Sequence, residues 1–169
     1  MRKTIGRFLL ISLITAFWAS NAESAVDISF SHPERYTDAG RYLGDRVSEP
    51  VLQEIKEYLE SLGERYLEPN QNLKIEILDI DLAGRYEPVH RGGVSDVRIL
   101  NDVTWPQIKV RYILEENGEV TVEKKESIAD MDYLRRPNPN FSNDSLRHEK
   151  VMLDDWFRER FGKDRPQHG

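Results

Sequence analysis

The segment Leu73–Arg85, with the sequence LKIEILDIDLAGR, constrains the fold more than any other part of the chain. Apolar residues alternate with polar ones from Leu73 to Ile77, which is the pattern of a strand with one buried face. The alternation then slips by one residue and continues from Leu78 to Leu82. Such a slip indicates either a β-bulge or a strand that is buried on both faces. We therefore expect a kinked strand in the centre of a sheet.

Four further stretches have strand patterns. Asn117-Gly118 is a signal for a tight turn, so the two strands around it should form a hairpin. The outward residues of the second hairpin strand are nearly all charged, which suits a sheet edge. The expected strands are Val26–Phe30, Val97–Leu100, Ile108–Leu114 and Val120–Lys125.

Two amphipathic helices complete the pattern. The first begins after Ser48, a good N-cap, and Gly63 is a plausible end. The second begins at Asn143–Ser145, carries Trp156 and Phe157 on its apolar face, and ends at Gly162. The apolar stripe of the first helix consists of Val51, Leu52, Ile55, Tyr58, Leu59 and Leu62.

These elements predict a single α+β domain over residues 26–162, followed by a polar tail at 163–169. We expect a mixed, partly antiparallel sheet of about four or five strands with both helices packed on one face. A chain of 169 residues is long enough for one domain with a real core and too short for two.

The first 25 residues have the three parts of a secretory signal peptide. Arg2, Lys3 and Arg7 are followed by an apolar run of twelve residues, Phe8–Ala19, and then by small residues around Ala22. The run is too short to span a bilayer, which takes about 20 residues. With no cysteine for a lipoprotein anchor, we expect a periplasmic or secreted protein without a stable membrane anchor after cleavage.

The charge of the chain excludes some partners. Cleavage after Ala22 would remove three positive residues and no acidic one, which takes the net charge from −6 to −9. Nucleic acid and anionic lipid should repel such a chain. The absence of cysteine also excludes disulfides, thiol chemistry and cysteine-ligated metals.

Two pairs of carboxylates are the clearest candidates for a site. Asp79 and Asp81 share one face at the end of the central strand, and Asp130 and Asp132 follow the hairpin. Together they could bind a hard cation such as calcium, or act as general acid and base. No calcium-loop spacing is present, and this spacing of Asp is common on solvated faces. We therefore expect neither a metal nor a cofactor.

Arg85 and Trp105 complete the candidate ligand-binding residues, which are Asp79, Asp81, Arg85, Trp105, Asp130 and Asp132. Arg85 belongs to Arg-rich loops that could hold an anion, although pairing with the neighbouring Asp residues is the simpler explanation. Trp105 precedes Pro106 at a loop edge and could mark a partner surface.

The remaining motifs give no catalytic residue. His148-Glu149 lacks a second histidine one turn later, so it is not a metalloprotease motif, and the histidines are expected on the surface. No Gly-x-Ser-x-Gly elbow and no phosphate-binding glycine loop are present.

Several motifs in combination resemble a known family, the secreted proteobacterial proteins grouped as domain of unknown function 3016. The resemblance covers nearly all of the mature chain and implies a Gram-negative exported protein. It transfers no activity, because the family has none assigned. The motifs are Val26–Phe30, Pro33–Ala39, Leu78–Arg85, Val97–Leu100, Trp105–Ile108, Asp130–Tyr133, His148–Lys150 and Asp155–Phe157.

The leading hypothesis is therefore a non-enzymatic binding or interaction module of the cell envelope. It would take an envelope protein or a small ligand through the loops at the end of Leu73–Leu82. The alternative is a carboxylate-dependent hydrolase of envelope material, with Asp79, Asp81 and Asp130 as candidate acid, base or metal ligands. It requires a pocket that holds at least two of these carboxylates within reach of one another. A purely structural oligomer is a third possibility, and the sequence leaves the oligomeric state open.

Overall fold

A computed structural model describes residues 25–39, 48–87, 97–137 and 144–162 and has the expected α+β architecture. The expected signal peptide, most of the loop after Tyr86 and the tail from 163 lie outside the described residues. The elements in chain order are β1 (Ala25–Phe30), a 3-10 turn η1 (Pro33–Arg35), α1 (Glu49–Tyr66), β2 (Gln71–Asp81), β3 (Arg85–Glu87), β4 (Val97–Ile99), β5 (Gln107–Glu116), β6 (Glu119–Ala129) and α2 (Arg147–Phe161).

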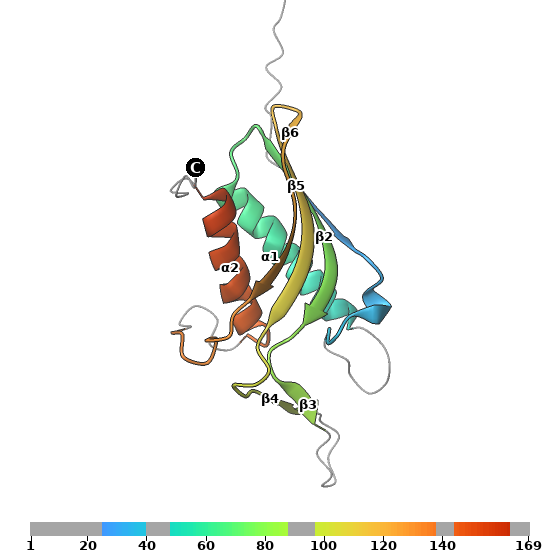
Figure 1. The fold of residues 1–169 in the computed structure, drawn as a ribbon, viewed down its shortest axis with the longest axis vertical. Coiled ribbons are helices and arrows are strands. Elements are labelled where there is room, and N and C mark those ends of the chain that lie inside the picture. Colours follow the sequence, from blue (N-terminus) through green and yellow to red (C-terminus); the bar gives the residue numbers. More distant parts are fainter. Residues whose placement is uncertain (1–24, 40–47, 88–96, 138–143, 163–169) are drawn as a thin grey trace, which may run out of the picture.

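The main sheet has four strands in the order β1-β2-β5-β6. β1 and β2 are parallel and are joined through α1, whereas β2, β5 and β6 pair antiparallel. α1 packs on β1, α2 packs on β6, and the two helices contact each other on the same face of the sheet (Figure 1). β3 and β4 form a separate two-stranded ribbon below the sheet.

The kink expected in the central strand is a β-bulge between Ile77 and Asp79. Ile77 pairs with Val110 and Asp79 pairs with Lys109, so Leu78 is the additional residue. The bulge keeps Ile77 and Ile80 both buried under the helices although they are three residues apart. Asp79 consequently turns to the opposite, open face.

The expected hairpin joins β5 and β6 through Asn117 and Gly118, whose φ values are 54° and 83°. Positive φ at both positions matches the twist of the flanking strands. β6 is a sheet edge, as its charged sequence indicated, and it extends to Ala129, four residues beyond the predicted end.

α1 buries the predicted stripe, but the expectation that Gly63 ends the helix is wrong. The helix continues to Tyr66, and Gly63 lies in its interior. A Cβ atom at this position would come within 2.0 Å of Cγ2 of Val26 on β1. Gly63 therefore allows the helix to pack closely on the strand. A local sequence pattern cannot distinguish this role from a helix stop.

α2 supplies three aromatic side chains to the core, Phe161 and, as predicted, Trp156 and Phe157. The rings of Trp156 and Phe161 both meet Tyr112 of β5 edge-on, with centroids 5.6 Å apart in each case. Glu126 of β6 accepts a hydrogen bond from the indole N–H of Trp156 at 2.9 Å and one from Arg160 at 3.1 Å. Burial alone would raise the pKa of Glu126, but these donors outweigh it and lower the pKa.

The face of the sheet away from the helices is lined by paired charges. Lys109 bonds Asp79 at 2.8 Å, and Arg111 bonds Glu76 at 2.7 Å, in both cases across β2 and β5. Surface pairs of this type contribute little to stability and keep the face hydrophilic. Among the described residues, no helix is both long and apolar enough to cross a membrane.

Candidate functional site

Asp79 is held in place on the open face of β2. Its carboxylate accepts hydrogen bonds from the backbone N–H of Thr37 at 2.8 Å and from the Thr37 hydroxyl at 3.1 Å. Lys109 donates a third at 2.8 Å. Burial alone would raise the pKa of Asp79, but the donors from Lys109 and Thr37 outweigh it and lower the pKa. Asp79 therefore anchors the chain after η1 to the sheet.

The surroundings of Asp81 raise its pKa, in contrast to those of Asp79. Burial raises its pKa, and the negative charges of Asp38 and Asp79 raise it further. Asp38 is adjacent because it forms an isolated parallel bridge with Asp81. The acidic end of β2 thus gathers three carboxylates.

The second Asp pair forms part of a structural turn. Asp130 is buried and accepts hydrogen bonds from the backbone N–H of Asp132 at 3.1 Å and from Arg136 at 3.0 Å. Asp132 is exposed and lies 3.5 Å from Arg135. The expected internal pairing of the Arg-rich loop with the Asp cluster is therefore present for Arg135 and Arg136.

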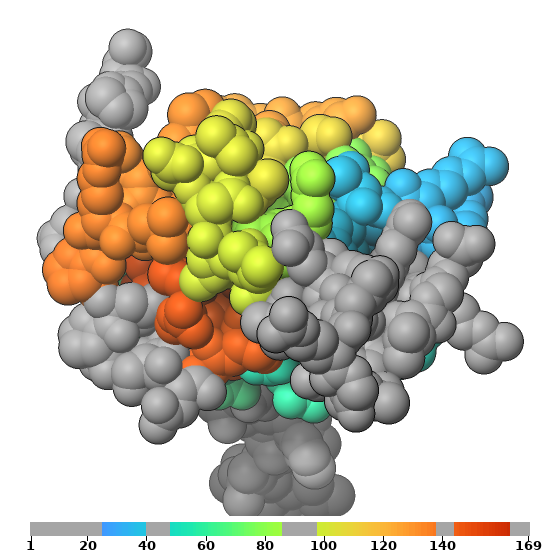
Figure 2. All heavy atoms as spheres, turned by 90° about the horizontal axis from the view of Figure 1, so that it is seen from below, coloured from blue at the N-terminus to red at the C-terminus, as the bar shows by residue number. Residues whose placement is uncertain are grey.

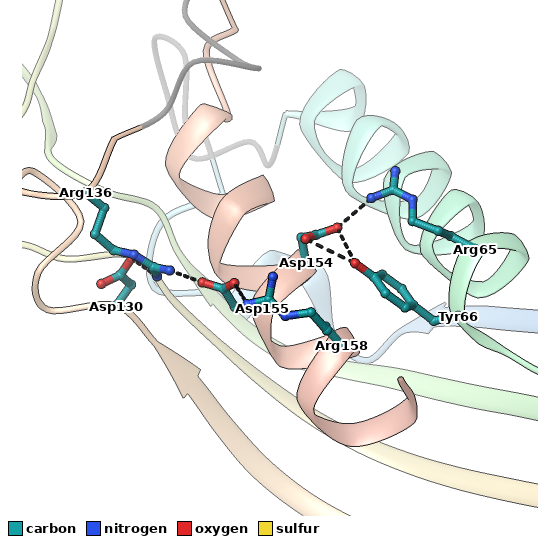
Figure 3. A network of polar contacts seen from close by, with 7 residues as sticks. All are labelled: Arg65, Tyr66, Asp130, Arg136, Asp154, Asp155 and Arg158. Atoms are coloured by element: carbon teal, nitrogen blue, oxygen red, sulfur yellow. Dashed lines mark hydrogen bonds and ion pairs between the residues drawn. The ribbon is translucent and has the colours of Figure 1, made fainter. Parts of the chain in front are cut away.

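Arg136 also bonds Asp155 of α2, which joins the turn to the helix (Figure 3). The network continues along α2, where Asp155 accepts a hydrogen bond from Arg158 at 2.5 Å. The preceding residue, Asp154, accepts a hydrogen bond from Arg65 of α1 at 2.7 Å. These contacts fix α2 against α1 and against the turn after β6.

The two Asp pairs do not converge. β5 lies between β2 and β6, which separates their ends by two strand spacings, or about 9–10 Å. Asp79 lies on the open face, whereas Asp130 faces the helix layer through Arg136. No group of three or more His, Cys, Asp or Glu side chains within the described residues is placed to hold a metal ion.

The other two candidate residues lie at the same end of the sheet as the Asp pairs. Arg85 is exposed at the start of β3, and Trp105 is half-buried just before β5. Both side chains are therefore accessible to solvent, Trp105 in part and Arg85 largely.

We call residues 97–106 and 130–136 together the loop end. Tyr133 joins its two segments, because its hydroxyl donates to the carbonyl of Asn101 at 2.7 Å and accepts from the N–H of Asn101 at 3.2 Å. Seen from below, the two segments form one continuous surface (Figure 2). This surface carries four exposed large apolar side chains: Ile99, Val103, Met131 and Leu134.

A buried ion pair supports the loop end from beneath. Glu149 of α2 is completely buried and accepts hydrogen bonds from the N–H of Ala83 at 2.8 Å and from Arg98 at 2.5 Å. Arg98 also donates to the carbonyl oxygens of Ala83 at 2.5 Å and Ser145 at 2.9 Å. These bonds connect β4, the turn after β2 and the start of α2.

A family model described as a protein of unknown function (DUF3016) matches residues 24–159. The chain belongs to the DUF3016 family. This confirms the family suggested by the sequence motifs.

No curated protein matches this DUF3016 chain. Among solved structures, it is similar to protein XCC0632 from Xanthomonas campestris, of the DUF330 family, at 12% identity over 82% of this chain and 80% of that chain, with a TM-score of 0.35. It is also similar to a minor lipoprotein from Acinetobacter baumannii at 12% identity, over 82% and 87% of the two chains, with a TM-score of 0.27.

The structure of this DUF3016 member also corrects one expectation about histidine. His148 was expected on the surface, but its Nε2 atom is buried without a hydrogen-bond partner among the described residues. Its ring lies edge-on to Tyr133 with centroids 4.7 Å apart. Burial lowers the pKa of His148, and the positive charge of Arg147 lowers it further.

Sequence reasoning missed the apolar residues of the loop end and the pair of Arg98 with Glu149. The sequence does contain a local signal for the apolar residues, since Val103 and Met131 are large apolar residues within polar turns. No local signal pointed to the pair, because its members are 51 residues apart.

Proposed function

We propose that this protein is an exported, non-enzymatic binding module of the cell envelope that docks a partner protein through the loop end. One observation carries the proposal. Within the described residues there are five exposed large apolar side chains, and four of them lie on the loop end. Apolar side chains concentrated in one exposed region are typical of an interaction surface.

The loop end is supported rigidly, which favours binding. Tyr133 is buried and joins the two segments, and the pair of Arg98 with Glu149 attaches β4 to α2. A surface that is already ordered loses little conformational entropy when a partner binds. The half-buried ring of Trp105 and the exposed Arg85 add the residue types that are enriched at the centres of interfaces.

The envelope location rests on the N-terminal segment. Its positive residues, its apolar run of twelve residues and the small residues after it fit a signal peptide. Export predicts that the protein in the periplasmic fraction lacks this segment. An intact-mass measurement of the protein from that fraction checks this.

One observation favours the hydrolase alternative. The pKa values of Asp79 and Asp81 are displaced in opposite directions, as in pairs of carboxylates that divide acid and base roles. However, the oxygens of Asp79 already accept bonds from Thr37 and Lys109, and Asp130 lies toward the other face. The binding function therefore has the stronger support.

Two charge substitutions on the loop end test the proposal. Val103→Asp and Met131→Asp introduce charge at side chains that are 73% and 66% exposed, so folding should be preserved. Val120→Asp is the matched control, because Val120 is 59% exposed at the hairpin near the opposite end of the sheet. Proteins recovered after cross-linking in intact cells are compared among the three variants and the wild type.

The proposal predicts that a specific cross-linked partner is lost from the Val103→Asp and Met131→Asp variants and retained by Val120→Asp. Equal recovery from all four proteins would contradict it. Thermal unfolding of each purified variant establishes that the loss does not come from unfolding.

A further inference from the structure

A second surface lies at the other side of the sheet, along the open edge of β1. β1 is the terminal strand of the main sheet, and no described strand pairs with its outer edge. In Figure 1 it is the blue strand farthest from α2. An open edge presents backbone N–H and C=O groups to any extended chain that approaches it.

The register with β2 identifies which groups face outward. Ser31 donates its N–H to the carbonyl oxygen of Ile77, so the odd-numbered residues of β1 bond β2. In a parallel pair, successive residues direct their backbone groups to opposite sides. The N–H and C=O groups of Val26, Ile28 and Phe30 therefore point to the open edge.

The two edges of the sheet are protected to different degrees. The other edge, β6, has five charged residues among its 11, four of them consecutive from Glu123 to Glu126, and such charges oppose pairing with another strand. β1 carries a single charged residue, Asp27, and has neither proline nor lysine. The edge of β1 is thus open to strand addition in a way that the edge of β6 is not.

A groove adjoins this edge on the side of the helices. It has a volume of about 480 Å³ and lies between β1 and the first turns of α1. Its apolar part is formed by Ile28, Phe30, Pro50 and Leu52, and its polar part by Glu49, Gln53 and Lys56. These residues are on the flank of α1 away from α2, since α1 meets α2 through Glu54, Arg65 and Tyr66.

We propose that the β1 edge and this groove together bind an extended segment of another polypeptide, in which apolar and polar residues alternate. The backbone of the segment pairs with Val26, Ile28 and Phe30. Its apolar side chains then fall on the same face as Ile28 and Phe30 and enter the groove. Main-chain bonds supply affinity and the groove supplies selectivity, as in other cases of strand addition.

The size of the surface favours a short segment over a second copy of the chain. β1 has six residues and spans about 20 Å. Stable interfaces between folded subunits involve about 20–30 residues on each side. A groove of about 480 Å³ instead lies in the range of pockets that bind a drug-sized ligand, about 300–1,000 Å³, and so has room for a few side chains of a peptide.

Amide hydrogen exchange followed by NMR tests this directly. The probe is a short synthetic peptide of threonine alternating with valine or phenylalanine. The control is the same peptide with alternate backbone nitrogens methylated, which removes donors and retains the side chains. At a peptide concentration ten times the dissociation constant, the amides of Val26, Ile28 and Phe30 should exchange about ten-fold more slowly. In the free protein these three amides should exchange fast, whereas those of Asp27 and Ser29, already bonded to β2, should exchange slowly even without peptide.

The same exchange experiment on a variant with a filled groove provides a second test. Gln53→Trp places a large ring in the groove from an exposed position on α1 and should abolish the protection. Glu57→Trp, one turn further along and outside the groove lining, should retain it. Thermal unfolding shows whether both variants are folded.

Three results would overturn the proposal. The first is that no peptide of the alternating series slows exchange at the three amides. The second is that the methylated control peptide slows exchange at the three amides as much as the unmethylated peptide does, which indicates binding without edge pairing. The third is protection that grows with protein concentration without peptide, which assigns the edge to a second copy.

Discussion

Asp79 and Asp81 are two residues apart on the open face of β2, yet their pKa values are displaced in opposite directions. Hydrogen bonds from Lys109 and Thr37 overcome the effect of burial at Asp79 and lower its pKa. Burial, Asp38 and Asp79 raise the pKa of Asp81. The charged form of Asp79 therefore stabilises the fold, whereas the charged form of Asp81 destabilises it.

Replacing Asp79 with asparagine and replacing Asp81 with asparagine should change the stability of the fold in opposite directions. The lowered pKa of Asp79 contributes stability above its unfolded value of 3.8, and this contribution disappears as the pH falls. The raised pKa of Asp81 has the reverse sign, so its charged form costs stability at pH 7. Asp79→Asn should lower the unfolding free energy at pH 7 by about 1–2 kcal/mol, and Asp81→Asn should raise it by up to about 1 kcal/mol.

Urea unfolding at pH 7 and at pH 3 measures both effects. The difference between the variants should be largest at pH 7 and should shrink toward pH 3, because both carboxyls of the unfolded chain take up protons as the pH falls below about 3.8. Destabilisation by Asp81→Asn at pH 7 would contradict the electrostatic account of this strand end.

Gly63 provides a test of the packing of α1 on β1. Alanine in a helix interior normally stabilises by about 0.5–1 kcal/mol relative to glycine. At Gly63 the added Cβ would meet Val26 at 2.0 Å, so we expect Gly63→Ala to destabilise by about 1–3 kcal/mol. The double variant with Val26→Ala should recover part of the loss. Purely additive effects in thermal unfolding would show that the two side chains do not interact.

Removal of Arg98 should be far more costly than removal of a surface arginine. Arg98→Met leaves the buried carboxylate of Glu149 without its positive partner, which typically costs about 3–5 kcal/mol. Arg111→Met breaks the exposed pair with Glu76 and should cost less than about 1 kcal/mol. Equal costs for the two variants in urea unfolding would mean that Arg98 does not support the loop end.

His148 should make the fold sensitive to mild acid. Because its pKa in the folded state is lowered from 6.5, the unfolded chain takes up a proton first as the pH falls. Stability should therefore decrease below about pH 6.5, and His148→Gln should remove that part of the decrease. The slope of unfolding free energy between pH 7 and pH 5 measures this. An unchanged slope in the variant would assign the sensitivity to other groups.

Local patterns in the sequence predicted the parts of the fold that depend on local chemistry. The slip after Ile77 marked the bulge, Asn117-Gly118 marked the hairpin, and the charges of β6 marked a sheet edge. Each of these follows from side-chain alternation or backbone conformation within a few residues.

Features that depend on distant contacts were not predictable in this way. The local sequence predicts a helix end at Gly63, because the residue that requires glycine there, Val26, lies 37 residues earlier on another element. His148 was assigned to the surface because the ring of Tyr133 covers it only in the folded chain. In the candidate site, too, only the features that depend on local spacing could be predicted. Asp79 and Asp81 were found by spacing, whereas the loop end requires two segments that Tyr133 brings together.

Site-specific photo-cross-linking in intact cells tests whether the loop end contacts a partner protein. A photoreactive amino acid replaces Val103 in one strain and Val120 in another, since both positions are exposed and lie near opposite ends of the sheet. We expect a discrete cross-linked adduct of one partner protein from position 103 and none from position 120. The absence of an adduct at 103, or the same adduct from both positions, would contradict it.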